Sequence, residues 1–366
     1  MKRTLFRTSV AIFFYYVLFV YPPLRLLDLH DVQWQSTIVL LCITVMPAVL
    51  RASQELMHNA TTRFFSALSF TWLGVCFQLF PLVVVHDLIN RVVAIPAGFS
   101  APVLSALISL LAVGGFINAQ VIRIRPITIE AGDTVAGIKV IHISDAHIGS
   151  RSPGLLNRIV KKANAANPDY VWITGDLIDF SNITKQHLAP LAQLNAPVFY
   201  VIGNHERYVD LKQIDQRLRE LGLNVLRNES VEHGPFQLIG IDDAERKTMV
   251  SEQLAHITVS ADRYPVLLYH RPDGLEAAAR AGIRLMLCGH THSGQLVPFN
   301  FIVKRYFPRM QGLFRVDNTT LYVSSGVGTW GPVLRIGSRS EMALIKFEPS
   351  AARNKEPSAA INKEPS

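Results

Sequence analysis

The sequence predicts an α/β domain over residues 138–347, preceded by about four transmembrane helices. Three observations lead to this prediction. Four long apolar runs lie in the first third of the 366 residues. Apolar strands then alternate with helical segments as far as residue 347. Five of these strands end directly at a residue that can bind a metal ion, three of them immediately after a glycine.

The apolar runs predict a transmembrane helical region over residues 1–125. They span residues 8–24, 32–50 and 64–85, with a fourth inside the charge-free stretch 92–122. About 20 apolar residues suffice to cross a ~30 Å hydrocarbon core. A cleaved signal peptide is the alternative for the first run. No small-x-small cleavage site follows that run, however, and three more apolar runs do.

Basic residues are unequally distributed between the predicted loops. Seven lie on one side of the membrane, namely Lys2, Arg3, Arg7, Arg51, Arg63, Arg123 and Arg125, and only Arg25 and Arg91 lie on the other. The side with the excess is normally cytoplasmic, so we expect both termini and the following domain in the cytoplasm. The net charge of +8 also fits a nucleic-acid partner, but loop cations that face anionic lipid account for it, and no nucleic acid is expected.

The remaining segments divide the rest of the chain. Residues 126–137 are expected to form a linker with a short strand at 127–129, and residues 348–366, which repeat EPSAARNK and EPSAAINK, a disordered tail. The predicted strands are residues 138–144, 170–174, 198–202, 237–241, 265–269, 284–288, 320–324 and 342–347, and the predicted helices are 153–166, 210–221 and 273–281. The three cysteines lie in apolar segments and predict buried hydrophobic side chains rather than disulfides.

Candidate metal ligands follow five of the predicted strands. The seven are Asp145, His147, Asp176, Asn204, His270, His290 and His292. Alternate residues of an extended chain share a face, so Asp145 and His147 can point at one spot. Imidazole nitrogens with carboxylate or amide oxygens suit manganese, iron or zinc, and the lack of thiolates in the motifs argues against a structural zinc site. Seven ligands are too many for one ion and suit two.

Two divalent ions define the expected chemistry. A two-metal centre needs a carboxylate that bridges ions roughly 3.5–4 Å apart. Asp176 is the natural bridge, because Gly175 allows close approach of its backbone. Such a centre activates water and holds the oxygens of a phosphoryl group, so the expected reaction is hydrolysis of a phosphate ester by hydroxide. We interpret Asp242-Asp243 as a turn, and Arg335 as either a phosphate contact or an exposed loop arginine.

These motifs resemble the calcineurin-like metallophosphoesterase superfamily. The resemblance covers SDAH (144–147), GDLID (175–179), GNHE (203–206), His270 and GHTH (289–292). The longer GHTHSGQ (289–295), YHRPDG (269–274) and residues 326–345 are similar to a membrane-associated bacterial branch and to animal transmembrane proteins with a metallophosphoesterase domain. Ala146 and Ser293 depart mildly from the usual Leu and Gly, and neither change removes a ligand.

The resemblance implies a fold of four layers, two packed sheets flanked by helices, and it implies roles for the site residues. Asp145, His147, Asp176 and His292 would hold one metal, and Asp176, Asn204, His270 and His290 the other. His205 would be the catalytic group that contacts the phosphate and protonates the leaving oxygen, with Asp179 as its partner. The resemblance also implies an integral protein of a bacterial inner membrane.

Three functions remain open at this point. The first is a membrane-bound phosphoesterase that acts on a lipid or lipid-linked phosphate. The second is a phosphodiesterase for soluble nucleotides, with the helices as an anchor only, and the third is a membrane sensor or scaffold without catalysis. Residues 299–310 interleave aromatic with basic residues, which indicates either a packed loop or a loop that rests on the bilayer beside the active site.

Overall fold

The computed structural model describes residues 2–32, 46, 49 and 59–349. The chain forms two compact units. The first comprises residues 1–119 together with Gly331–Ile336, and the second comprises Gln120–Trp330 together with residues 337–366. The first unit is helical, and the second contains every strand that the described residues form.

The helical unit contains three candidate membrane spans among the described residues: Leu5–Leu29, Ala60–Asn90 and Ala97–Gln120. The first combines α1 (Lys2–Tyr15), a π-helical segment η1 (Tyr16–Val20) and α2 (Tyr21–Leu29). The other two are α4 (Ala60–Asn90) and α5 (Ala97–Gln120). Three of the four predicted runs therefore coincide with these spans. The run at 32–50 lies almost entirely outside the described residues.

Gly331–Ile336 packs within the helical unit rather than the α/β unit. Small residues of the helices allow the close approach. A Cβ on Gly115 would lie 2.8 Å from the Ile336 side chain. The Arg335 amide donates to the Gly115 carbonyl at 3.0 Å, and the Arg335 side chain is 1% exposed. Arg335 is therefore not the exposed loop arginine that was one of its two interpretations.

The second unit contains two six-stranded sheets. The first has the order β1-β12-β2-β3-β4-β5 and the second the order β10-β11-β9-β8-β7-β6. The strands of the first are β1 (Arg123–Ala131), β12 (Glu341–Pro349), β2 (Lys139–Ile143), β3 (Tyr170–Thr174), β4 (Val198–Val201) and β5 (Asn224–Val225). Those of the second are β10 (Gly312–Val316), β11 (Thr319–Val323), β9 (Leu285–Cys288), β8 (Tyr264–Leu268), β7 (Phe236–Gly240) and β6 (Glu229–His233).

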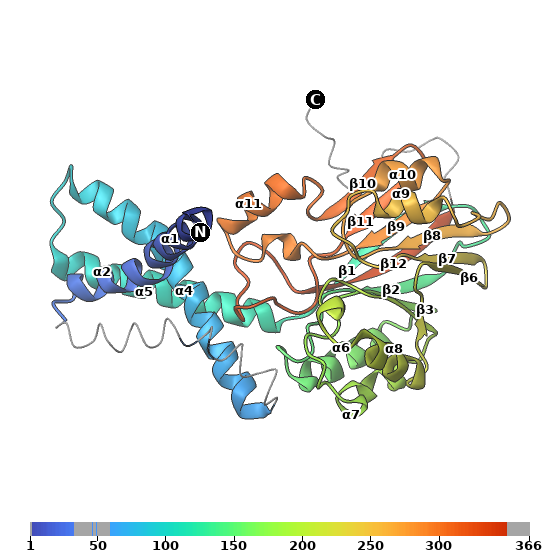
Figure 1. The fold of residues 1–366 in the computed structure, drawn as a ribbon, viewed down its shortest axis with the longest axis horizontal. Helices are drawn as coiled ribbons and strands as arrows, with labels where there is room; N and C mark the ends of the chain where they lie inside the picture. The colour runs from blue at the N-terminus through green and yellow to red at the C-terminus, as the bar shows by residue number, and fades with distance from the viewer. Residues whose placement is uncertain (1, 33–45, 47–48, 50–58, 350–366) are drawn as a thin grey trace. The chain divides into compact units, whose positions relative to one another are not determined.

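Alternating side chains of the strands build three apolar layers. Val140 of β2 points between the sheets and packs with residues such as Leu268 of β8, whereas Ile141 points to the other face of its sheet. That outer face is covered by α6 (Pro153–Ala165), α7 (Lys185–Leu188) and α8 (Leu211–Glu220), and the second sheet by α9 (Met249–Leu254) and α10 (Leu275–Arg280) (Figure 1). The expected fold, two packed sheets flanked by helices, is confirmed.

Two boundaries differ from the sequence prediction. The expected linker 126–137 is wrong as far as residue 131, because β1 pairs in parallel with β12 over its whole length. Its pattern of buried Ile127, Ile129 and Ala131 is only three alternations long and follows Pro126, so it gave a weak strand signal. The expected tail also starts too early, because β12 extends to residue 349. Residues 350–366 lie outside the described part of the chain.

Candidate metal centre

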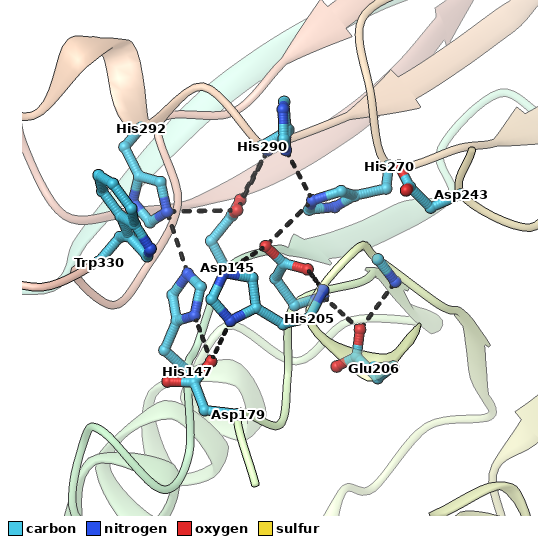
Figure 2. Close-up of polar contacts among 12 residues, drawn as sticks. Asp145, His147, Asp179, His205, Glu206, Asp243, His270, His290, His292 and Trp330 are labelled. Carbon is cyan, nitrogen blue, oxygen red and sulfur yellow. Dashed lines mark hydrogen bonds and ion pairs between the residues drawn. The ribbon is translucent and has the colours of Figure 1, made fainter. Parts of the chain in front are cut away.

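The parallel strands deliver the predicted ligands to one edge of the two sheets. β2 and β3 are parallel neighbours in the first sheet, as are β3 and β4, and β8 and β9 are parallel neighbours in the second. Carboxyl ends of parallel strands meet at the same edge, and the loops that follow them carry the polar motifs. The ligands gather there in two clusters (Figure 2).

The first cluster consists of Asp145, His147 and His292, whose ligand atoms all lie within 4.8 Å of one another. The Nε2 atoms of His147 and His292 are 3.0 Å apart, and His292 Nε2 is 3.5 Å from Asp145 Oδ1. All three side chains are buried. The cluster therefore presents two imidazole nitrogens and a carboxylate oxygen to one point.

The second cluster consists of Asp176, His270 and His290, again within 4.8 Å. His270 Nε2 lies 3.2 Å from Asp176 Oδ2 and 3.2 Å from His290 Nδ1. Asn204 lies in the loop whose flanking residues both approach Asp176: the His205 amide donates to Asp176 Oδ1 at 2.9 Å, and a Cβ on Gly203 would lie 2.2 Å from that oxygen. The seven predicted ligands are thus all found at this edge.

The donor set fits divalent cations. The Nε2 atoms of His147 and His292 face each other at 3.0 Å, a contact that is favourable only if they share a proton or both bind a cation. Asn204 Oδ1 is buried and has no hydrogen-bond partner among the described residues, which is costly unless a ligand binds it. Neutral imidazoles and carboxylate or amide oxygens without thiolates are the ligands of manganese, iron and zinc.

The charges of the second cluster show the same need for a cation. Burial opposes ionisation of Asp176, but the neighbouring His270 holds the pKa of that carboxyl well below its usual range. Burial likewise disfavours protonated His270, but the carboxylates of Asp176 and Asp145 raise its pKa to about 10. Burial and the positive His270 lower the pKa of His290 well below its usual value. A buried carboxylate therefore demands positive charge at the position between these rings.

Asp179 orients two of the histidines. Its Oδ1 lies 2.8 Å from His147 Nδ1 and 2.7 Å from His205 Nδ1, so each ring turns its Nε2 toward the centre (Figure 2). Burial opposes its ionisation, but the charge of His147 and hydrogen bonds from both rings hold the pKa of Asp179 well below its usual range. Burial disfavours protonated His205, but Asp179 and Asp176 raise its pKa to about 9. A carboxylate that holds a ring in this way fixes its tautomer.

The backbone at the centre is strained. Five of the seven predicted ligands have positive φ: Asp145 (57°), His147 (53°), Asp176 (50°), His290 (72°) and His292 (49°). Residues other than glycine adopt this conformation rarely, and it persists only where the surroundings impose it. At Gly175 a Cβ would lie 2.4 Å from the Gly203 amide nitrogen, so only glycine lets the second and third motif loops touch. Strain at ligands is a feature of functional sites.

Glu206 is a residue whose role the sequence did not reveal. Its fully buried carboxylate accepts four backbone N–H groups, at 2.7–3.0 Å, from Asp176, Leu177, Ile178 and Gly203. It thereby ties the loop after β3 to the loop after β4 (Figure 2). Burial and the negative charge of Asp176 raise its pKa. The only sequence signal was an acidic residue directly after the Asn204-His205 pair, which is ambiguous with a solvated turn residue.

Comparison with known proteins gives a consistent match. The family model described as calcineurin-like phosphoesterase matches residues 138–294. A zebrafish (Danio rerio) transmembrane protein with metallophosphoesterase domain is 32% identical over 321 residues, which are 76% of this chain and 73% of that protein. An uncharacterized metallophosphoesterase of Campylobacter jejuni is 30% identical over 236 residues, 62% of this chain and 63% of its own length.

Another uncharacterized metallophosphoesterase, from Helicobacter pylori, is 36% identical over 223 residues, and the chain spans 60% of its length. The chain therefore spans less than two thirds of these bacterial relatives. Among solved structures, an archaeal phosphodiesterase is similar with 13% identity and a TM-score of 0.32, over 52% of this chain and 85% of that one.

Proposed function

Because the chain belongs to the calcineurin-like metallophosphoesterase family, we propose that it is a membrane-bound, metal-dependent phosphoesterase that uses two divalent ions. The observation that carries this proposal is the pair of ligand clusters at one edge of the two sheets. In each cluster, buried donor atoms lie close enough together to bind one cation. The three candidate membrane spans in the same chain support the membrane association.

The residues have separate roles in the proposed reaction. Asp145, His147 and His292 would hold one ion, His270, His290 and Asn204 would hold the other, and Asp176 would serve both. When bound, two such ions supply a hydroxide at neutral pH and neutralise charge on the phosphoryl group. His205 is partly exposed at the rim of the centre. Asp179 accepts from its Nδ1 and raises the pKa of the ring, so that Nε2 also carries a proton that it can give to the leaving oxygen.

Metal analysis of the purified full-length chain tests the two-ion proposal directly. The expected result is two manganese, iron or zinc ions per chain and phosphate-ester hydrolysis that stops after chelation. One tightly bound ion with full activity would remove the bridging role of Asp176. Hydrolysis that survives chelation would contradict the metal-dependent proposal itself.

A surface beside the centre favours a lipid or lipid-linked substrate. Residues 299–306, expected as a loop, form helix α11 (Phe299–Tyr306), none of whose side chains is buried. Phe301, Ile302 and Tyr306 are 68%, 51% and 72% exposed. With the exposed Lys304 and Arg305 we call them the α11 face. Aromatic residues interleaved with cations are typical of segments at lipid headgroup depth.

The α11 helix is built onto the metal-binding loop. The Asn300 amide donates to the Leu296 carbonyl at 3.2 Å, and a Cβ on Gly294 would lie 2.3 Å from Asn300 Cα. At the other end of the helix, the Phe307 ring lies 5.2 Å from that of the predicted ligand His290. A lipid headgroup that meets the α11 face would therefore be close to the ions.

Removal of the two α11 cations tests the lipid substrate. Lys304→Ala/Arg305→Ala should lower kcat/KM for phosphatidic acid in anionic vesicles much more than for p-nitrophenyl phosphate, because each cation gains about 1 kcal/mol near anionic lipid. Arg309 is left unchanged, because it pairs with Glu276 at 2.7 Å. Lys161→Ala/Lys212→Ala, two exposed lysines of α6 and α8, is the matched control.

The outcomes separate the candidate functions. A selective loss on phosphatidic acid supports the lipid substrate. Equal losses on both substrates, or none, would favour soluble nucleotides, for which a panel of nucleotide diesters is the direct assay. Intact metal binding without hydrolysis of either class would favour the sensor or scaffold.

The orientation of the α/β unit is also proposed, as cytoplasmic, from the seven-to-two distribution of basic residues. The proposed orientation requires residues 32–50 to form a fourth span. Alkaline phosphatase fused after residue 366 should be inactive, and the same reporter inserted between Arg91 and Ile95 should be active. Activity of the first fusion would place the α/β unit outside the cytoplasm and indicate an odd number of spans.

A further inference from the structure

A cavity of about 730 Å³ lies in the α/β unit beside the metal centre. This volume is in the range of sites that enclose small-molecule ligands. Its lining includes Asn204 and Arg207 after β4, Arg227 after β5, Asp242 and Asp243 after β7, and Arg271 after His270. Because the predicted ligand Asn204 is part of the lining, the cavity is continuous with the centre.

Asp243 holds two arginines in this cavity. Its carboxylate Oδ1 accepts from Arg271 Nε at 2.7 Å, and its backbone carbonyl accepts from Arg207 Nη1 at 2.6 Å. Asp243 is 2% exposed and lies beside His270, so it is not the simple turn residue that the sequence indicated (Figure 2). One buried residue thus fixes two guanidinium groups from segments 64 positions apart in the chain.

The two arginines are placed by the metal-binding motifs themselves. Arg207 follows Asn204-His205-Glu206, and Arg271 directly follows His270. Both arginines are therefore within three residues, along the chain, of a predicted metal ligand. A ligand that reaches the ions through Asn204 would extend past these arginines.

The ion pairs of this wall leave the guanidinium of Arg207 without a carboxylate partner. Arg271 is neutralised by Asp243, and Arg227 by Asp242, whose two oxygens accept from it at 2.7 Å each. Arg207 instead donates to a carbonyl oxygen, and among the described residues no carboxylate forms an ion pair with it. A full positive charge beside the metal centre, held in place but not neutralised, is suited to an anionic partner.

We propose that this cavity binds the part of the substrate beyond the scissile phosphoryl group, and that Arg207 recognises a second phosphate on that part. The inference rests on the proposed hydrolase function and narrows its substrate class to molecules with two phosphate groups. Such a molecule can be a phosphorylated lipid headgroup or a soluble metabolite, which share this chemistry. A guanidinium that is already held in position loses little freedom on binding, so it adds affinity efficiently.

Binding of two non-hydrolysable probes tests whether the cavity recognises a soluble molecule with two phosphate groups. The metal-loaded, full-length protein is titrated by calorimetry with propylphosphonate and with propane-1,3-bisphosphonate. The wild type should bind the bisphosphonate more tightly, and Arg207→Ala should reduce that preference about 10- to 100-fold, the equivalent of one lost charge-assisted hydrogen bond. Arg207→Lys should retain part of it, because the charge remains.

A second pair of probes tests the lipid form. Vesicles that contain phosphatidic acid, with one phosphate per headgroup, are compared with vesicles that contain phosphatidylinositol 4-phosphate, with two. Preference for the second phosphate in the soluble pair indicates a soluble metabolite, and preference in the vesicle pair indicates a lipid headgroup. Either preference supports the proposal if Arg207→Ala removes it.

The control is Arg263→Ala. Arg263 directly precedes β8 and also donates to a backbone carbonyl, that of Gly234 between β6 and β7. It lies outside the cavity lining. Metal content reports folding of each variant. An unchanged preference in Arg207→Ala with two ions bound would overturn the subsite. A metal-loaded wild type that hydrolyses no phosphate ester would instead overturn the proposed function.

Discussion

The two sheets contribute different chemistry to the centre. Both carboxylates among the predicted ligands, Asp145 and Asp176, follow strands of the first sheet, whereas the second sheet supplies only imidazoles, those of His270, His290 and His292. The negative charge that would attract metal ions thus comes from one sheet. The second sheet would complete the coordination with ligands that are neutral when they bind metal.

The second-sheet ligands are also held by groups of the first sheet. His270 Nδ1 donates to the Thr174 carbonyl at 2.7 Å, which fixes its tautomer and leaves Nε2 for the centre. The His290 amide donates to both carboxylate oxygens of Asp145, at 3.1 Å each. The first sheet is therefore the framework of the centre, and the second is oriented by it. Substitutions in the two sheets should have unequal consequences.

The largest expected effect is that of Asp176→Asn. A neutral amide cannot balance two dications, so both ions and all hydrolysis should be lost. His290→Gln, in the second sheet, should lose only the ion of its own cluster and keep roughly one per chain. Metal content by plasma mass spectrometry, together with hydrolysis of bis-p-nitrophenyl phosphate, measures both. Equal metal loss in the two variants would contradict the unequal roles of the sheets.

The next largest effect is expected for His205→Gln. Both ions should remain, because the seven predicted ligands are unchanged, while kcat falls by about 10²–10⁴-fold, the usual result of removing a general acid. The decrease should be smaller for a leaving group of low pKa, such as p-nitrophenolate, than for an alkyl alcohol, because the former needs little protonation. A metal-free variant would instead show that His205 is a ligand.

Glu206→Gln tests whether the first sheet is the rigid framework. Each oxygen accepts two backbone N–H groups, so replacing either one by the amide's NH₂ group removes two of the four buried hydrogen bonds. We expect about 3–5 kcal/mol of lost stability, typical of a broken buried charge interaction. For a domain of this size the melting temperature falls by roughly 2–4 °C per kcal/mol.

The measurement for Glu206→Gln is thermal unfolding in detergent with and without saturating metal. Glu232→Gln, an exposed residue of β6, is the control. A melting temperature within 1–2 °C of the wild type would correspond to a stability loss of less than ~1 kcal/mol. That result would show that the four hydrogen bonds do not hold the loops together.

The strands and the positions of the ligands could be predicted from sequence because both depend on local pattern. A buried apolar strand followed by Gly-Asp or Gly-His specifies where the polar residue lies, as at Asp176 and His290. The arrangement of β1 could not be predicted in the same way. Its strand pairs with β12, more than 200 residues away, and such pairing leaves no mark in a local window.

Other features depend on tertiary contacts alone. Asp243 was interpreted as a turn residue and no role was predicted for Glu206, and only the fold shows that both are buried. Likewise, the periodicity of residues 299–306 was masked by interleaved cations, although those residues form α11. The sequence did not single out Arg207, because only the fold brings Arg207 and Arg271 to the same residue, Asp243.

The smallest expected effect concerns His142, which lies in β2 of the first sheet. Its ring is fully buried between Thr174 and Tyr322, with Nε2 2.8 Å from Thr174 Oγ1, and burial lowers its pKa to about 3. The unfolded chain, with a pKa of about 6.5, binds the proton first. Stability from this residue is therefore complete above about pH 6.5 and is lost as the pH falls toward 3.

At pH 5 the proton linkage at His142 should cost about 2 kcal/mol, or roughly 4–8 °C in melting temperature. His142→Gln cannot titrate, so its melting temperature should fall less between pH 7.5 and pH 5 than that of the wild type. Chelator is present throughout, so that loss of metal does not contribute. His256→Gln, an exposed histidine, serves as control. Parallel decreases in wild type and His142→Gln would show that the acid sensitivity of the first sheet comes from its carboxylates instead, and not from this buried ring.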